Sequence, residues 1–136
     1  MITVSVKVKG RLEEIWDHFT NPEHIINWNF ASEDWCSPRA NNDLRIGGKF
    51  MTRMEAKDGS FGFDFEGIYT EVTEYKGYTY ELEDGRLVVV SFEVIDGGVM
   101  VREDFDSESE NTAEAQEYGW QCILENFKKY SEALGE

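Results

Sequence analysis

One acidic residue lies where the surrounding sequence is apolar. Glu103 alternates with Val99, Val101 and Phe105 along a predicted strand over residues 98–106, so these four side chains share one face of a sheet. A carboxylate on an apolar face is costly unless it is paired, hydrogen-bonded or protonated. It could bind a polar group of a ligand or act as a general base with a raised pKa. The alternatives are exposure near the strand end or an ion pair, with Arg45, Arg53 or Arg102 as the candidate partner.

The same two-residue alternation predicts which apolar side chains would surround this carboxylate. In residues 61–73, one face carries Phe61, Phe63 and Phe65, and the other carries Ile68, Thr70 and Val72. The change of face falls at Gly67, as a bulge there would produce. In residues 86–95 the apolar set is Val88, Val90, Phe92 and Val94. Such side chains could line a pocket for an apolar or planar ligand, or they could fill the core and leave no pocket.

Cysteine and histidine do not suggest a further site. Cys36 and Cys122 are the only cysteines, and neither has a neighbour at metal-ligand spacing. His18 and His24 are six residues apart and are poorly placed to share one helix face. Cys36 has no histidine near it in the sequence, so its thiol is not predicted to be a nucleophile. We therefore predict no catalytic residue, no cofactor and no metal site.

Composition limits the class of protein. The 136 residues carry 13 basic and 28 acidic side chains, a net charge of −15, which would repel nucleic acid and anionic membranes. No apolar run approaches the roughly 20 residues needed to span a bilayer, and the first residues alternate instead of forming a signal peptide. We expect one cytoplasmic domain over residues 1–136, monomeric or weakly dimeric. Its acidic surface would serve solubility, or it could attract a basic protein partner.

The elements that position these residues follow from periodicity. Ile2, Val4, Val6 and Val8 predict a strand over residues 2–9, and Leu12, Ile15, Trp16 and Phe19 predict an amphipathic helix over residues 11–20. Pro22 then begins a second short helix that reaches Trp28. Residues 29–42 lack a period and are predicted as a structured loop. Turn signals divide the rest into strands at 45–56, 61–73, 78–83, 86–95 and 98–106, which makes six antiparallel strands.

The loop at residues 29–42 is rich in large apolar groups for an irregular segment. With Trp28 before it, the loop contains Phe30, Trp35 and Cys36. It could form a lid over a pocket, a protein-contact patch or an ordinary cap on the core.

A long helix is predicted over residues 111–134. Its apolar stripe consists of Trp120, Ile123, Phe127, Tyr130 and Leu134, at alternating spacings of three and four residues. At about 1.5 Å per residue the helix would be roughly 33 Å long, enough to cross the whole sheet. Gly119 inside it costs about 1 kcal/mol relative to alanine. It indicates close approach to a strand or a cavity rim, or else a tolerated surface glycine.

The segment from Asp43 to Phe50 contains two adjacent glycines, Gly47 and Gly48, read here as lying inside a strand. Glycine weakens a strand, so a pair of glycines suits a sharp bend or a close approach of other backbone. A strongly bent antiparallel sheet encloses a hollow. The alternative is a bulge at a sheet corner without a hollow.

Together these features resemble the activator of heat-shock-protein-90 ATPase homologue-like domains of the START/SRPBCC (birch-pollen-allergen-like) superfamily. The resemblance rests on the order of elements, the segment from Asn21-Pro22-Glu23 to Trp28, the motif at residues 43–50, and Gly119-Trp120. It implies an α+β helix-grip fold: a strongly curved six-stranded antiparallel sheet wrapped around the C-terminal helix, with two short helices between strands one and two. It also implies a pocket between the sheet and that helix.

Three functions follow from the resemblance and the residues. The first is binding of an apolar, aromatic or lipid-like small molecule, with Phe61, Phe63, Phe65, Ile68, Val90, Phe92, Val101, Glu103, Trp120, Ile123 and Phe127 as the ligand-binding set. The second is a chaperone co-factor or other protein-interaction module in a stress response. The third is an enzyme of the polyketide cyclase or aromatase kind, for which the inward polar groups would be Glu103, Thr70 and either Tyr69 or Tyr80. We favour the first, because polar groups for catalysis are few.

Overall fold

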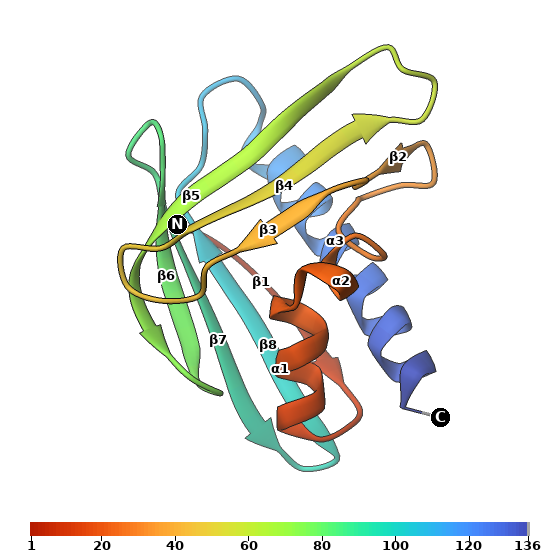
Figure 1. Cartoon of the computed structure of the whole chain (residues 1–136), viewed down its shortest axis with the longest axis vertical. Coiled ribbons are helices and arrows are strands. Elements are labelled where there is room, and N and C mark those ends of the chain that lie inside the picture. The colour runs from red at the N-terminus through yellow and green to blue at the C-terminus, as the bar shows by residue number, and fades with distance from the viewer. Residues whose placement is uncertain (136) are drawn as a thin grey trace.

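The computed structural model, which describes residues 1–135, has an antiparallel sheet that curls as a half-barrel around one long helix (Figure 1). Its strands are β1 (Ile2–Val8), β2 (Trp35–Cys36), β3 (Ala40–Asn42), β4 (Lys49–Ala56), β5 (Gly62–Thr73), β6 (Gly77–Leu82), β7 (Leu87–Ile95) and β8 (Gly98–Phe105). The order across the sheet is β1-β8-β7-β6-β5-β4-β2, and β3 also pairs with β4. The first and last strands of the chain therefore lie side by side.

The α+β class and the curved antiparallel sheet are confirmed, but the prediction of six strands is wrong. The two additional strands, β2 and β3, lie in the segment expected to be a loop, and both pair antiparallel with β4. Strands of two and three residues are too short to show a two-residue alternation. Only their hydrogen bonds to β4 define them.

The glycine pair lies before β4, not inside a strand, so the strand start expected at residue 45 is wrong. Residues 43–48 form a tight turn in which the Gly48 N–H donates to the Arg45 carbonyl at 2.8 Å. Gly47 has a φ of 83°, a conformation that favours glycine. A Cβ on Gly48 would overlap the carbonyl oxygen of Asp43. The pair therefore serves a turn that leads into β4.

The irregularity in β5 also differs from the prediction. The pairing of β5 with β6 shifts register between Tyr69 and Glu71, not at Gly67. As a result Phe63, Phe65, Gly67 and Tyr69 share one face of β5 on a continuous alternation, and Phe63 at its outer end is still 40% exposed. The predicted inward placement of Ile68 and Thr70 is wrong: both are exposed, Ile68 by 51%.

Two short helices close one end of the half-barrel (Figure 1). α1 (Leu12–Thr20) buries Ile15, Trp16 and Phe19, as its period predicted. α2 (Pro22–Ile25) begins at Asn21, whose side chain accepts a hydrogen bond from the Glu23 N–H.

The long helix α3 (Ala113–Leu134) lies across the concave side of the sheet. Thr112 caps its N-terminus by accepting the Ala115 N–H at 3.1 Å. The indole of Trp120 stacks on Phe105 of β8 with ring centroids 3.9 Å apart. Phe127 is fully buried and packs edge-on against Phe19 and Trp28. This helix therefore joins β8 to the α1–α2 end.

Side chains of α3 also form hydrogen bonds with the free edge of β1 and the residue after it. Gln121 donates to the Ser5 carbonyl and Lys128 donates to the Lys7 carbonyl, each at 2.9 Å. Glu132 accepts the Lys9 N–H at the same distance. An uncovered strand edge invites pairing with another chain, and these contacts protect the edge.

The two histidines lie together although their spacing did not suggest it. The chain turns at Asn21-Pro22, which brings the rings of His18 and His24 to 4.9 Å. His24 Nδ1 contacts the Tyr130 hydroxyl at 2.7 Å, and His18 Nδ1 contacts the Ser131 hydroxyl at 2.8 Å. Burial and the neighbouring His24 lower the pKa of His18. The pair thus connects α1 and α2 to the last turns of α3.

Within residues 1–135, no helix combines the length and apolar character needed to cross a bilayer.

Candidate functional site

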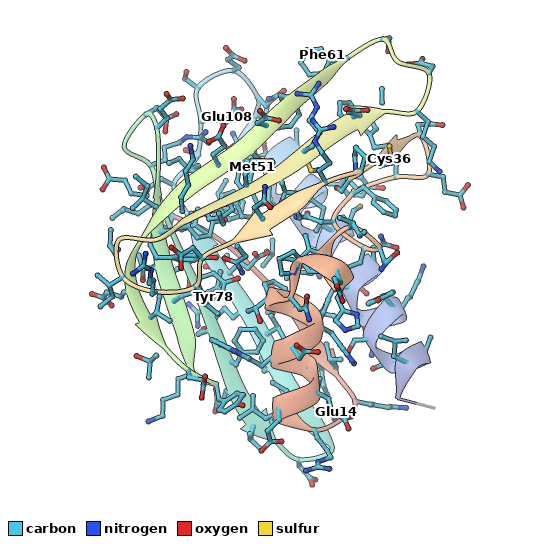
Figure 2. All side chains as sticks on the ribbon, viewed as in Figure 1. Glu14, Cys36, Met51, Phe61, Tyr78 and Glu108 are labelled. Atoms are coloured by element: carbon cyan, nitrogen blue, oxygen red, sulfur yellow. The ribbon has the colours of Figure 1, made fainter. Side chains whose placement is uncertain are left out.

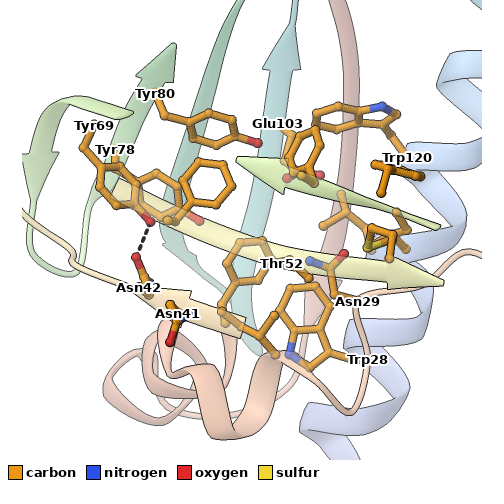
Figure 3. A pocket seen from close by; sticks show the side chains of 18 residues that line it. Trp28, Asn29, Asn41, Asn42, Thr52, Tyr69, Tyr78, Tyr80, Glu103 and Trp120 are labelled. Carbon is orange, nitrogen blue, oxygen red and sulfur yellow. Dashed lines mark hydrogen bonds between the residues drawn. The ribbon is translucent and has the colours of Figure 1, made fainter. Parts of the chain in front are cut away.

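A cavity of about 220 Å³ lies between the concave face of the sheet, the side of α3, and the segment from α1 to β3 (Figure 3). Its walls are mostly aromatic, with a small number of polar groups. It is lined by Phe19, Ile25, Trp28, Asn29, Asn41, Asn42, Phe50, Thr52, Met54, Phe63, Phe65, Tyr69, Tyr78, Tyr80, Glu103, Trp120, Ile123 and Leu124.

The aromatic wall follows from the alternation of β4, β5 and β6. Phe65 and Tyr69 face inward from β5, and Tyr80 from β6 lies beside them. Gly67 leaves a gap between Phe65 and Tyr69 that the ring of Phe50 occupies. A Cβ on Gly67 would come within 2.6 Å of Phe50 Cε1 and 3.0 Å of Tyr80 Cδ2. The missing side chain on β5 is thus what lets the aromatic rings close up around the cavity.

Glu103 lies on the inner face of β8 and borders this cavity, with 8% of its surface exposed. Burial raises the pKa of its carboxyl group to about 8. The arginine partners considered from sequence are engaged elsewhere: Arg45 pairs with Asp43, Arg53 with Glu55 and Asp64, and Arg102 with Asp104. Glu103 has no ion-pair partner within residues 1–135.

Tyr69, Tyr78 and Tyr80 supply hydroxyl groups to the cavity. The Tyr69 hydroxyl donates to Asn42 Oδ1 at 2.6 Å, and Asn42 Nδ2 donates to the Thr20 carbonyl at 2.7 Å. Figure 3 shows this Tyr69–Asn42 bond at one end of the cavity. Burial raises the pKa of Tyr78 and Tyr80 well above the ordinary value, so both hydroxyls stay protonated at neutral pH.

The predicted site residues fall into three groups. Five line the cavity: Phe63, Phe65, Glu103, Trp120 and Ile123. Four are buried in the packed core beside it: Val90, Phe92, Val101 and Phe127. Two lie outside: Ile68 is on the opposite face of β5, and Phe61 is 60% exposed near the tip of the β4–β5 hairpin (Figure 2).

Sequence reasoning did not select several lining residues. Tyr69 and Tyr80, named from the sequence as candidate inward polar groups, both line the cavity, and Tyr78 alternates with Tyr80 on β6, so strand parity could have found Tyr78 as well. Phe50 follows the glycine turn, and no pattern in the sequence indicated that it would face the cavity. Asn41 and Asn42 lie in β3, which the sequence did not predict, so nothing in the pattern pointed to them.

The segment before β4 contributes both to the core and to the surface. Trp28 is buried, stacks on Phe19 and borders the cavity. Trp35 is half-buried and meets Phe61 and Phe63 edge-on at 6.0 and 6.2 Å, which makes an aromatic cluster at the hairpin end.

Comparisons with known proteins agree with this architecture. The family model for the Activator of Hsp90 ATPase homolog 1-like protein matches residues 9–132. The solution structure of an AHSA1-like protein from Aeromonas hydrophila is 42% identical, with a TM-score of 0.92 over 98% of this chain and 93% of that one. A solution structure from Cytophaga hutchinsonii is 43% identical, with a TM-score of 0.84 over 98% of this chain and 92% of that one.

More distant structures share the fold alone. A crystal structure of a protein from Nitrosomonas europaea is 18% identical, with a TM-score of 0.83 over 98% of this chain and 95% of that one. The comparison with curated proteins gave no match. The resemblance stated from the sequence is confirmed by the family match and by the helix-grip fold of the START/SRPBCC superfamily. This chain belongs to the family of Activator of Hsp90 ATPase homolog 1-like proteins.

Proposed function

We propose that this protein binds a small apolar or aromatic molecule in the cavity between the sheet and α3. The observation that carries the proposal is the cavity itself, about 220 Å³ lined mainly by aromatic side chains. An interior packed only for stability leaves few voids larger than a water molecule. A space of this size with aromatic walls and few polar groups has the character of a ligand pocket.

The size of the cavity limits the ligand. An apolar cavity of about 150 Å³ holds benzene, and pockets for drug-sized ligands measure about 300–1,000 Å³. At about 220 Å³ the cavity suits a molecule of one or two rings. The net charge of −15 disfavours the approach of an anionic ligand.

Native mass spectrometry of the protein purified from its own host, followed by organic extraction, tests the proposal first. We expect a co-purifying apolar molecule of low mass. A titration with naphthalene, followed by amide shifts in NMR spectra, then measures binding directly. We expect shifts to concentrate at β5, β6 and the middle of α3.

A matched pair of variants locates the binding site. Ile123→Trp would fill the cavity and should weaken naphthalene binding by at least about tenfold, since the ring would occupy the same space. Ile68→Trp adds the same side chain on the outer face of β5 and should leave binding unchanged. Equal effects of the two variants, or no naphthalene binding by the wild-type protein, would contradict the proposal.

A second candidate function, a protein-interaction module, is supported by the aromatic cluster of Trp35, Phe61 and Phe63 together with the family match. Exposed aromatic residues are frequent anchors of protein interfaces. A pull-down with the middle domain of the Hsp90 chaperone tests this function. Binding that is lost in Phe61→Ser and kept in Ile46→Ser, a change at another exposed apolar residue, would support it. No binding by the wild-type protein would exclude this partner.

A further inference from the structure

One wall of the cavity carries two tyrosine hydroxyl groups and one carboxyl group. Tyr78 and Tyr80 lie two residues apart on the inner face of β6, with their rings stacked at 6.2 Å. Glu103 borders the same cavity from β8, and Val90 of β7 pairs with Tyr78 on one side and with Glu103 on the other, so these residues lie in one row across the inner face of the sheet. Figure 3 shows the Tyr80 ring directed towards Glu103.

These three groups have hydrogen-bonding capacity to spare. Tyr69 on the neighbouring strand is already bonded to Asn42, whereas Tyr78, Tyr80 and Glu103 have no side-chain partner among residues 1–135. Among residues 1–135, every side-chain nitrogen or oxygen that has no accessible surface forms a hydrogen bond. The oxygens of these three groups form no such bond, so they must keep some accessible surface, and the cavity that they line provides it.

No charged group faces Glu103 from the elements packed around it. Its register partners on the same face are Val4 of β1 and Val90 of β7. The part of α3 that borders the cavity contributes Trp120, Ile123 and Leu124. The titratable groups that face Glu103 are the tyrosines of β6. Arg86, whose charge acts on Tyr80, is paired with Asp84 in the turn between β6 and β7.

We propose that Tyr78, Tyr80 and Glu103 form a polar subsite that binds the carbonyl oxygen of an uncharged aromatic ketone or aldehyde. This inference rests on the proposed function of the cavity. The three groups offer hydrogen-bond donors to the cavity, so a complementary ligand must carry an acceptor. A carbonyl oxygen is a pure acceptor with two lone pairs. The aromatic walls would hold the ring, while the subsite fixes which end of the ligand points towards β8.

The charge state of the subsite favours a carbonyl ligand over other ligand classes. With a pKa of about 8, the Glu103 carboxyl is mostly protonated at neutral pH and can donate. A carboxylate ligand would be buried as an anion without a cation, which is unfavourable. An aliphatic or aromatic hydrocarbon would leave the donors unpaired. Above pH 8, ionised Glu103 would attract the tyrosine hydroxyls to itself and repel a carbonyl oxygen.

Acetophenone and α-methylstyrene form the matched pair of probes that tests the inference. They have nearly the same shape, and only acetophenone has a carbonyl oxygen. At pH 6 we expect acetophenone to bind the wild-type protein about tenfold more tightly, the value of one net hydrogen bond. At pH 9.5 we expect this preference to disappear, while α-methylstyrene binding stays the same. Benzoate should bind more weakly than acetophenone at both pH values.

Three variants test whether the preference for acetophenone over α-methylstyrene depends on the subsite. Tyr80→Phe should reduce the acetophenone preference at pH 6 without weakening α-methylstyrene binding. Glu103→Gln keeps an N–H donor at every pH, so its preference should persist at pH 9.5. Tyr118→Phe removes a hydroxyl from an exposed tyrosine on α3 and serves as the control.

The outcomes separate this inference from the proposed function. If neither probe binds, the proposed function fails. If both probes bind equally at pH 6, the cavity binds apolar molecules and the carbonyl subsite is wrong. A preference that survives Tyr80→Phe, or that is independent of pH in the wild-type protein, would also overturn the subsite. The wild-type comparisons remain decisive if a variant does not fold.

Discussion

At the scale of single residues, Glu103 is the feature that departs most from a simple apolar core. Its carboxyl group is buried, unpaired within residues 1–135, and next to an aromatic cavity. Burial without a partner favours the neutral form, and this accounts for the raised pKa. Ionisation of such a residue lowers the free energy of unfolding, so its effect on stability can be measured as a function of pH.

Replacement of Glu103 by glutamine should change how stability depends on pH. In the unfolded chain the carboxyl titrates near pH 4.5, and in the folded protein near pH 8, so the folded state binds more protons between these values. The free energy of unfolding of the wild-type protein therefore loses a contribution as pH rises from about 4.5 to about 8, and the loss is complete above pH 8. Glutamine does not titrate. The stability of Glu103→Gln relative to wild type should rise across this window by an amount on the order of 4 kcal/mol and then level off.

Urea denaturation at pH 5, 6.5, 8 and 9 measures this difference. The pH dependence of all other groups is common to both proteins and cancels. Glu93→Gln, a change at an exposed glutamate of β7, is the matched control. A difference between Glu103→Gln and wild type that stays constant from pH 5 to pH 9 would show that Glu103 is ionised and compensated in the folded state.

At the scale of elements, the glycines of α3 and of the turn before β4 have opposite roles. Sequence reasoning favoured close approach or a cavity rim for Gly119, and close approach is wrong: a Cβ there would meet nothing within 4 Å. Gly48 is the reverse case, because backbone atoms of the same turn occupy the space of its Cβ. One glycine is tolerated within its element, and the other is required by its turn.

These two glycines should therefore respond in opposite ways to substitution by alanine. Gly119→Ala removes the entropic cost of glycine in a helix and should stabilise the protein by about 1 kcal/mol. Gly48→Ala forces the turn to open and should destabilise it by about 1–3 kcal/mol. Thermal or urea unfolding of both variants checks this. A loss of stability in Gly119→Ala would contradict the open space around the Gly119 Cα.

At the scale of the whole molecule, the excess of acidic side chains dominates the electrostatics. The net charge is −15, so most carboxylates have no cation to pair with. The ion pairs that exist, such as Arg45–Asp43 and Lys49–Glu66, are largely exposed. Exposed pairs contribute about 0–1 kcal/mol each, whereas repulsion acts between all the uncompensated charges.

Added salt should therefore stabilise this protein. Screening at high ionic strength weakens the repulsion among the carboxylates more than it weakens the few exposed pairs. We expect the thermal midpoint to rise between 20 and 500 mM NaCl at pH 7. A midpoint that falls with salt would show that the ion pairs outweigh the repulsion. The same measurement in sodium sulfate would add a salting-out effect, so NaCl is the better choice.

The sequence by itself determined the elements with strong periods. Alternation defined β1, β7 and β8, the three- and four-residue spacing defined α1 and the core stripe of α3, and both follow from local geometry that any long amphipathic segment must obey. It also placed Glu103 on the apolar face of β8, because parity is a property of the strand alone. The family resemblance supplied the order in which these elements assemble.

Only the tertiary structure decided where the two-residue alternation of the strands is interrupted. The bulge in β5 depends on the pairing of β5 with β6 and lies beyond Ile68, so the unbroken alternation through Gly67 leaves Ile68 outward. The strands β2 and β3 exist because β4 offers them hydrogen bonds. Arg45, Arg53 and Arg102 each pair with a carboxylate two residues away in the sequence, whereas the surroundings that leave Glu103 unpaired within residues 1–135 come from other strands and from α3. Partners that are distant in sequence meet only after the sheet has curved, so no local pattern can encode which of them lie beside the cavity.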